Sequence, residues 1–445
     1  MAFYPSSAIS LFNRSFHLEN PLQYYQTPQS RTGPDLTIMG GSASKSANRT
    51  LNVSLQNVMN SGTVYAYITG QAIDNNNALF LLQANGQTPY YPTSPTSTGA
   101  ALAVDCGIPL GGPGTNRIVT IPRIAGGRIW FCVNDRLTFL LNPGPGLVEP
   151  SVSNPSDPNY NKNWGFCEFT FNSLQLFANI TYVDFVSLPI ALTLLNTSGA
   201  SQHVAGIPAN GLDTVCSGLI AQNNVDKAGW DKLIVKSSSG GNLRALSPNT
   251  GHVMNGNLFS GYYAGYVNAV WAKYASADLT INTQAQWGNV AGRVVNGLLT
   301  FPGVGTFAQP SAADIFSCST GPFAASPTNT AEMGNIGARL AAAFNRSTLL
   351  VDSNQPEGEV VSTYYKTSPT NHYSRIVHGA NLDGRGYAFP YDDVGSSSGG
   401  DQSGSVSDGS PALFTVAVGG NGVQVSNTVK ASKWRVVRNI RRFLK

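Results

Sequence analysis

The stretch WGFCEFTFNSLQLFANITYVDFVSLP, residues 164–189, decides the fold of this 445-residue chain. Its first half alternates in character, with an apolar set of Cys167, Phe169 and Phe171. The intervening polar set is Glu168, Thr170 and Asn172. Because successive side chains of a β-strand point to opposite faces, this pattern predicts a strand with one face in a core and the other facing solvent or a ligand.

The second half of the stretch places one carboxylate in apolar surroundings, since Asp184 stands between Val183 and Phe185. An ionised carboxylate is costly there unless it is hydrogen-bonded or faces a cleft. If residues 173–179 close an antiparallel hairpin, Glu168 and Asp184 lie opposite each other. Two carboxyl groups in unlike environments suit acid/base cleavage of a glycosidic bond. The alternative is a structural pair, because structural networks also perturb carboxylates.

Several longer motifs carry a resemblance to a known family. They are the region from Ile121 through FCEFTFN, VDFVSLP at 183–189, PSAADIFSCSTGPFA at 310–324, RLAAAFNRSTLL at 339–350 and GRGYAFPYDDV at 384–394. Together they resemble glycoside hydrolase family 64, the laminaripentaose-producing β-1,3-glucanases of the thaumatin-like superfamily. The likeness runs from about residue 50 to about residue 420.

The resemblance implies catalytic roles for both carboxylates. It makes Glu168 the general acid and Asp184 the general base of an inverting hydrolase. An inverting pair needs about 6.5–9.5 Å between its carboxyl groups, whereas directly opposed strand residues have Cβ atoms only about 4.5–5.5 Å apart. The predicted hairpin therefore requires splayed side chains or a shifted register.

Other polar residues are candidates for holding sugar hydroxyls. Thr170 and Asn172 share the predicted face of Glu168, and Asp157 and Trp164 lie in the loop before that strand. Asp392 and Asp393 match the acidic corner of thaumatin-like clefts. For the loop and PYDDV residues a role in turns or caps is an equal alternative, because Asp and Asn bond readily to nearby backbone.

Composition and charge favour a loop-rich β protein that acts on a neutral polymer. Charged residues make up only 11% of the chain, and Gly and Pro are abundant. The net charge is +4, but residues 430–445 contain seven Lys/Arg and no acid, so subtracting seven leaves −3 for the remainder. A mildly acidic body suits a neutral β-1,3-glucan as partner and argues against nucleic acid.

The cysteines and histidines predict neither a metal nor a cofactor. The five histidines show no metal-ligand spacing. The five cysteines leave at least one thiol without an intrachain partner. Cys167 neighbours Glu168 and could be read as a nucleophile, but strand alternation turns it to the opposite, buried face.

The order of the patterns predicts a mainly β protein. Strand patterns occur at 63–70, 78–83, 128–133, 137–141, 385–389, 413–418 and 423–425, and helical spacing occurs within 212–220, 263–274 and 333–344. We expect a β-barrel or sandwich at 46–196 and 362–425, with a smaller mixed α/β domain inserted at 197–361 and an open groove where the two meet. The resemblance implies that the first domain is a thaumatin-like β-barrel and that the groove is a wide cleft for a glucan chain. The aromatic stripe Tyr263, Trp271, Tyr274 is expected to pack in the core.

The ends of the sequence are expected to lie outside these domains. Residues 1–45 read as an extension and 426–445 as a basic tail, which is either weakly docked or able to lie on an anionic surface. The N-terminus lacks the apolar core of a signal peptide, so an extracellular or cell-wall location follows only from the resemblance. No apolar run is long enough to span a bilayer. We expect a monomer.

The sequence therefore predicts a β-1,3-glucan hydrolase without cofactor. The rival is a non-catalytic thaumatin-like glucan-binding protein, and a third class is a structural wall protein. Both carboxylates stand within matching motifs, which favours the enzyme.

Overall fold

The computed structural model describes residues 49–420. The predicted extension at 1–45, the basic tail at 426–445 and the strand at 423–425 lie outside these residues. Within the described part the protein is mainly β, with several sheets and a smaller helical content. None of the helices in this part is long and apolar enough to cross a membrane.

Two large sheets carry most of the strands. The eight-stranded sheet contains β23 (Ser405–Asp408), β12 (Leu176–Ile180), β11 (Asn163–Phe171), β8 (Ile124–Val133), β2 (Val64–Ala72), β3 (Ala78–Leu82) and β4 (Pro89–Tyr90) in that order, with β6 (Ile108–Pro109) beside β2. The five-stranded sheet contains β15 (Ser201–Val204), β14 (Ile190–Asn196), β24 (Pro411–Val418), β1 (Thr50–Asn57) and β7 (Asn116–Pro122).

These two sheets pack face to face around one core. The rings of Phe169 on β11 and Phe414 on β24 lie 6.5 Å apart, centroid to centroid. Cys167, Phe169 and Phe171 are buried, as the alternating pattern predicted. The five-stranded sheet joins distant parts of the chain, because β1 and β24 pair in parallel from opposite ends of the described residues.

Three smaller sheets complete the strand inventory. They are β10 (Gly146–Val148), β9 (Leu140–Asn142) and β5 (Ala100–Ala101); β13 (Phe185–Val186), β17 (Asn242–Leu246) and β16 (Ile234–Lys236); and β21 (Gly305–Phe307), β20 (Leu298–Phe301), β19 (Asn289–Val295), β18 (Leu279–Asn282) and β22 (Asn354–Gln355).

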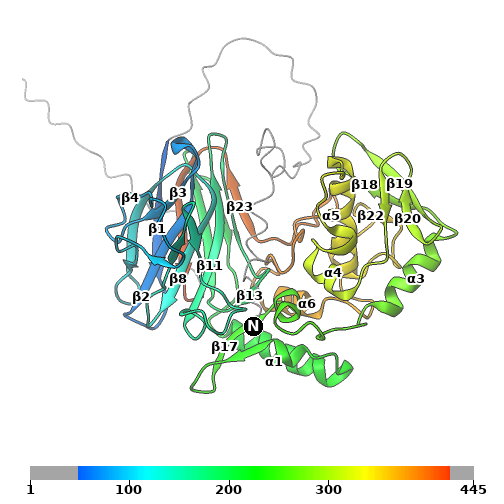
Figure 1. Ribbon diagram of the computed structural model, residues 1–445, viewed down its shortest axis with the longest axis horizontal. Helices are drawn as coiled ribbons and strands as arrows, with labels where there is room; N and C mark the ends of the chain where they lie inside the picture. The colour runs from blue at the N-terminus through cyan, green and yellow to red at the C-terminus, as the bar shows by residue number, and fades with distance from the viewer. Residues whose placement is uncertain (1–48, 421–445) are drawn as a thin grey trace, which may run out of the picture.

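Most helices lie in the second half of the described chain. The α-helices are α1 (Gly211–Asp226), α2 (Pro248–Met254), α3 (Ala264–Tyr274), α4 (Ala312–Ser317), α5 (Ala331–Arg346) and α6 (His372–Ala380). Four 3-10 turns are η2 (Ile73–Asn75), η3 (Trp230–Leu233), η4 (Gly321–Phe323) and η5 (Val361–Thr363). Figure 1 shows the two large sheets on one side, α3, α4, α5 and the β18–β22 sheet on the other, and α1, α6, β13 and β17 between them.

The long periodic patterns were predicted correctly. Helical spacing within 212–220, 263–274 and 333–344 corresponds to α1, α3 and α5. The aromatic stripe of α3 is buried, with Tyr263, Trp271 and Tyr274 at 1%, 7% and 0% exposure, so it packs in the core. Helical positions with a 3.6-residue period identify a core-facing stripe reliably when the stripe is this long.

Two short strand predictions were wrong or too long. Residues 385–389 form no strand, because the only pairing there is an isolated bridge between Tyr387 and Thr181. Glycines at 384 and 386 and a proline at 390 interrupt the pattern. In the predicted strand at 137–141 only the end is paired, within β9.

The sheets also extend past the expected domain limits. β15 follows the expected limit at residue 196, yet it pairs with β14 in the five-stranded sheet. Between residues 362 and 404 the chain forms η5 and α6 and contributes no strand to the two large sheets. α6 instead packs against α1.

Close packing of β8 on β11 depends on Gly127. A Cβ atom placed there would stand 2.5 Å from the Phe169 ring. We therefore expect Gly127→Ala to lower the free energy of unfolding by about 1–3 kcal/mol, because overpacking forces the ring or the strand to move. Urea denaturation measures this, with Gly62→Ala, which meets no atom within 4 Å, as the matched control. Equal stability of the two variants would contradict this account of the packing.

Candidate active site

The polar face of β11 carries the first candidate acid. Glu168 keeps 37% of its side chain exposed, while its neighbours Cys167 and Phe169 are buried in the sandwich core. Period-two alternation therefore places the carboxylate on the outer face of the eight-stranded sheet. Thr170 shares this face and is half-buried.

The predicted pairing of Glu168 with Asp184 was wrong. A tight turn lets Phe171 pair with Leu176, so the register continues to Glu168 opposite Asn179. Strand β12 then ends at Ile180, and Asp184 follows it just before β13. The predicted connection of seven residues, 173–179, has only four residues in the structure, 172–175, so the partner of Glu168 moves from Asp184 to Asn179. The two carboxyl groups are thus not directly opposed, which removes the conflict with the spacing of an inverting pair.

Backbone bonds fix the second candidate acid where the chain passes from one sheet to another. The carbonyl of Asp184 accepts a hydrogen bond from the Ser247 amide at 2.9 Å, and Phe185 pairs with Leu246 of β17. The carboxyl group itself accepts no hydrogen bond from the residues that the structure describes. Asp184 also lines a small cavity together with Tyr182 and Phe185. Its lone pairs are therefore available to a water molecule or a substrate.

Arg128, which the sequence reasoning did not single out, joins the acids on this face. It pairs across the strands with Glu168, whose Oε1 accepts from Arg128 Nε at 3.3 Å, and its Nη1 is ion-paired with Glu149. The guanidinium also lies 5.0 Å from the Phe166 ring centroid and 5.5 Å from that of Trp130. One cation is therefore held between two carboxylates and two aromatic rings.

The electrostatics of this group centre on Asp184. Burial raises the pKa of Asp184 from 3.8 to about 6; Arg128 opposes this rise, and the charges of Glu168 and Glu149 add to it. Burial also raises the pKa of Glu149, against the effect of Arg128. Burial alone would lower the pKa of Arg128, but the surrounding carboxylates outweigh it and raise that pKa. Asp184 thus belongs to one coupled set of charges with Glu168, Glu149 and Arg128.

A second arginine that the sequence reasoning missed anchors the loop before β11. Arg244 on β17 is fully buried and donates from Nη2 to the carbonyls of Tyr160 and Lys162, at 2.7 and 2.9 Å. Its guanidinium lies within 6 Å of the Trp164 and Phe185 ring centroids. Burial lowers the pKa of Arg244 to about 10. Arg244 therefore connects the segment that leads to Glu168 with the strand that follows Asp184.

No local sequence signal could have identified these two arginines as partners of the acids. Arg128 stands 40 residues before Glu168, and Arg244 belongs to a strand more than 50 residues after Asp184. A predicted strand at 128–133 placed Arg128 on a sheet, but only the β8–β11 register brings it beside Glu168.

Four of the predicted sugar-binding residues lie on β11 or beside it: Thr170 and Trp164 are on the strand, so the prediction of Trp164 in the preceding loop was wrong, whereas Asp157 precedes the strand and Asn172 follows it directly. Thr170 is half-buried on the face of Glu168. Asn172 accepts hydrogen bonds from the amides of Leu174 and Gln175, so it caps the hairpin turn. Asp157 accepts from the Asn159 amide within a turn, and Trp164 is 1% exposed and donates to the Asn159 carbonyl. Trp164 therefore presents no open ring face to a ligand in this conformation.

The two acids of PYDDV differ from each other. Asp392 has no exposed surface and is bonded to Arg346 and His378, at 3.0 and 2.9 Å, so it makes no direct contact with a sugar in this conformation. Asp393 is half-buried, and its Oδ1 accepts from the Tyr387 hydroxyl at 3.1 Å. Burial and the charges of Asp393 and Glu168 raise the pKa of Tyr387, so Asp393 and Tyr387 belong to the surroundings of Glu168.

The thiols take no part in this site. All five cysteines are buried and unbridged, and burial raises the pKa of Cys167. Among residues 49–420 no group of three or more His, Cys, Asp or Glu side chains has the arrangement of a metal site.

The raised pKa of Asp184 predicts a stability gain on its removal. The folded protein holds a proton that the unfolded chain loses at lower pH, so stability falls as pH rises from about 4 to about 6. Asp184→Asn should raise the free energy of unfolding at pH 7 by up to about 3 kcal/mol and by little at pH 4. Urea denaturation at both pH values measures this, with the exposed Asp231→Asn as control. An equal effect at both pH values would contradict the assignment.

Comparison with known proteins places the chain in a family. Residues 49–418 match the glycoside hydrolase family 64 model, described as Beta-1,3-glucanase. A glucan endo-1,3-beta-glucosidase of Arthrobacter sp. (strain YCWD3) is 29% identical over 62% of this chain and 50% of its own length. The chain thus spans about half the length of the curated relatives that it matches.

Solved structures agree with this placement. A laminaripentaose-producing β-1,3-glucanase in complex with laminaritetraose is 31% identical, with a TM-score of 0.73 over 83% of this chain and 98% of that one. A β-1,3-glucanase domain from Clostridium beijerinckii is 20% identical and shares the fold, with a TM-score of 0.65 over the same shares of the two chains. The chain therefore belongs to glycoside hydrolase family 64, the β-1,3-glucanases.

Proposed function

We propose that this protein hydrolyses β-1,3-glucan to short oligosaccharides, laminaripentaose above all, with Glu168 and Asp184 as the catalytic pair. The observation that carries the proposal is the single charge cluster of Glu168, Asp184, Glu149 and Arg128 on the outer face of the eight-stranded sheet. The family and the solved relative that binds laminaritetraose support the choice of substrate.

The proposed reaction is one displacement by water. Glu168 donates its proton to the glycosidic oxygen as the bond to the anomeric carbon breaks. Asp184 takes a proton from a water molecule as the water oxygen forms the new bond on the opposite face of the sugar, which inverts the anomeric centre. The half-exposed Glu168 and the unbonded carboxyl group of Asp184 support this division. The reaction needs no cofactor.

The charges around Glu168 and Asp184 determine the pH range in which the two residues can act. A base must be ionised, and the raised pKa of Asp184 makes it fully available only above about pH 6. Arg128 opposes that rise and holds one oxygen of Glu168. Thr170 and Asp393, both half-buried near Glu168, are the proposed contacts to sugar hydroxyls.

The finer architecture belongs to the same proposal. We infer a thaumatin-like β part, a mixed α/β part inserted after β15 rather than from residue 197, and a wide cleft between them for the glucan chain. An extracellular or cell-wall location and a monomeric state follow from the same family reading. Ligand sites commonly form at such a junction between domains, which supports the inference.

One observation favours the opposite assignment of roles. A raised pKa is typical of a general acid, and burial raises the pKa of Asp184. Under that reading Asp184 protonates the leaving group and Glu168 activates water. The non-catalytic glucan-binding alternative instead requires no turnover at all.

Removal of either carboxyl group tests the activity. Glu168→Gln and Asp184→Asn should each lower the release of reducing ends from linear β-1,3-glucan by at least about a hundredfold, since general acid/base groups contribute about 10²–10⁴-fold. Proton NMR of the first product should show the α-anomer. Full activity in either variant contradicts the assignment, and an inactive parent protein with intact glucan binding supports the binding protein instead.

Leaving-group chemistry separates the two roles. A variant that lacks the general acid should retain activity on an activated aryl β-glucoside of a β-1,3-linked oligosaccharide, because such a leaving group needs little protonation. We expect this retention for Glu168→Gln and not for Asp184→Asn. The reverse pattern would exchange the roles.

The pH profile tests the influence of Arg128. The acidic limb of kcat/KM should have its midpoint near pH 6, and Arg128→Met should move it upward by about one unit or more, because an opposite charge close to a carboxylate typically shifts its pKa by about 1–3 units. Arg128→Lys keeps the charge and serves as the matched control. An unchanged limb in Arg128→Met, with the folded state confirmed by circular dichroism, would contradict the coupling.

A further inference from the structure

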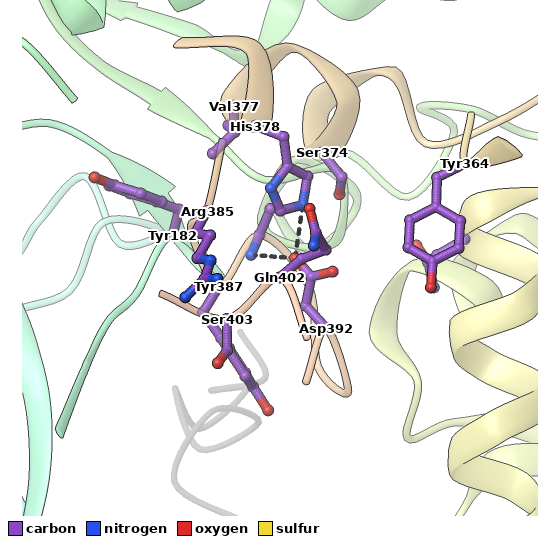
Figure 2. Close-up of polar contacts among 12 residues, drawn as sticks. Tyr182, Tyr364, Ser374, Val377, His378, Arg385, Tyr387, Asp392, Gln402 and Ser403 are labelled. Atoms are coloured by element: carbon purple, nitrogen blue, oxygen red, sulfur yellow. Dashed lines mark hydrogen bonds and ion pairs between the residues drawn. The ribbon is translucent and has the colours of Figure 1, made fainter. Parts of the chain in front are cut away.

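A second cavity lies beside the segment that carries PYDDV. Its volume is about 410 Å³, and its lining includes Tyr364, Tyr365, His378, Arg385 and Gln402. Pockets for small molecules range from about 300 to 1,000 Å³, so this one is large enough for a sugar-sized ligand. Figure 2 shows Arg385 and Tyr364 on opposite sides of His378.

A buried charge network makes one wall of this cavity rigid. His378 has Nδ1 at 3.1 Å from the Gly384 carbonyl and Nε2 at 2.9 Å from Asp392, as Figure 2 shows for the latter. Both partners offer acceptor atoms to the ring, and Asp392 is itself held by the buried Arg346. The ring of Tyr365 stacks on His378, with 5.9 Å between centroids. The wall is therefore fixed before any ligand binds.

The lining also offers polar groups with unused bonding capacity. The guanidinium of Arg385 is exposed and makes no hydrogen bond or ion pair with other described residues. Gln402 donates from its side chain to the Asp401 carbonyl, which leaves its amide oxygen available as an acceptor. Asp383 adds a carboxylate whose Oδ1 already accepts from the Arg385 amide.

The balance of these groups indicates the chemistry of the ligand. Arg385 supplies donors, whereas Gln402 and Asp383 supply acceptors, and the charges of Arg385 and Asp383 offset each other. Both ring nitrogens of His378 already lie at hydrogen-bond distance from Gly384 and Asp392. A hydroxyl group both donates and accepts hydrogen bonds, so a neutral polyol can use both kinds of group in this lining. Its apolar face can also pack on the tyrosine rings, so a polyol is a better ligand for this cavity than an anion or a cation.

We propose that this cavity is a remote subsite that holds a glucosyl unit of the β-1,3-glucan chain. The inference rests on the proposed function, because it takes its ligand from that reaction. Continuity with the carboxylates supports it: Tyr387 lies close enough to Glu168 for that charge to act on its pKa, and Arg385 stands two residues earlier on the same segment. Across the sheet, Glu168, Asn179 and Ser405 are successive partners, and Gln402 precedes Ser405 by three residues.

The subsite can be tested by binding measurements in a variant that does not cleave the sugar. In Glu168→Gln protein, Arg385→Ala and Gln402→Ala should each weaken the binding of laminarihexaose, followed by calorimetry. The expected loss is about tenfold for Arg385→Ala, the factor for one charged hydrogen bond, and a smaller one for Gln402→Ala. Arg293 is exposed on β19, and Arg293→Ala is the matched control. It should bind laminarihexaose with the same affinity as the Glu168→Gln protein. In the active protein the two subsite variants should shift products toward shorter oligosaccharides.

The outcomes separate the subsite from the activity. Unchanged hexaose affinity and an unchanged product pattern in both variants would overturn the subsite, as would tighter binding of inorganic phosphate than of hexaose that depends on Arg385. If the parent protein does not cleave β-1,3-glucan, the proposed function fails. Loss of hexaose affinity in Arg385→Ala but not in Arg293→Ala then still supports a sugar site in this cavity.

Discussion

The candidate site depends on one cation, the guanidinium of Arg128, which interacts with several carboxylates. Arg128 is paired across β8 and β11 with Glu168, is ion-paired with Glu149, and acts on the pKa of Asp184. Three carboxylates this close would repel one another, and the guanidinium, which packs against two neighbouring aromatic rings, offsets part of that repulsion. The sandwich beneath must therefore hold β8 and β11 in a fixed register, which the close contact of Gly127 with Phe169 helps to set.

The same arrangement explains why the two candidate acids differ. Glu168 projects from the middle of a strand and is partly exposed, whereas Asp184 sits at a crossing between sheets, where its backbone is bonded and its carboxyl group is not. Burial then raises the pKa of Asp184, at some expense to stability at neutral pH. Unfavourable burial of an ionisable group is a frequent property of functional sites.

A second buried charge network serves a different purpose. Arg346, Asp392 and His378 are bonded together almost out of contact with water, and they hold α5, α6 and the PYDDV segment in one arrangement. Breaking such a network by removing one partner leaves an uncompensated buried charge. Asp392 is therefore bonded entirely within the protein in this conformation, and the more accessible polar side chains around it are those of Asp393, Arg385 and Gln402.

The sequence by itself determined the mainly β character, the core face of β11, the α1, α3 and α5 helices and the family, because period-two and 3.6-residue patterns and long motifs are local properties of the chain. It also identified Glu168 and Asp184 as unusual acids. Only the tertiary structure decided that Glu168 faces Asn179, that residues 385–389 form no strand, that Trp164 and Asp392 are buried, and that Arg128 and Arg244 support the site. These features depend on turn length, register and contacts between residues far apart in sequence, and no local pattern encodes them.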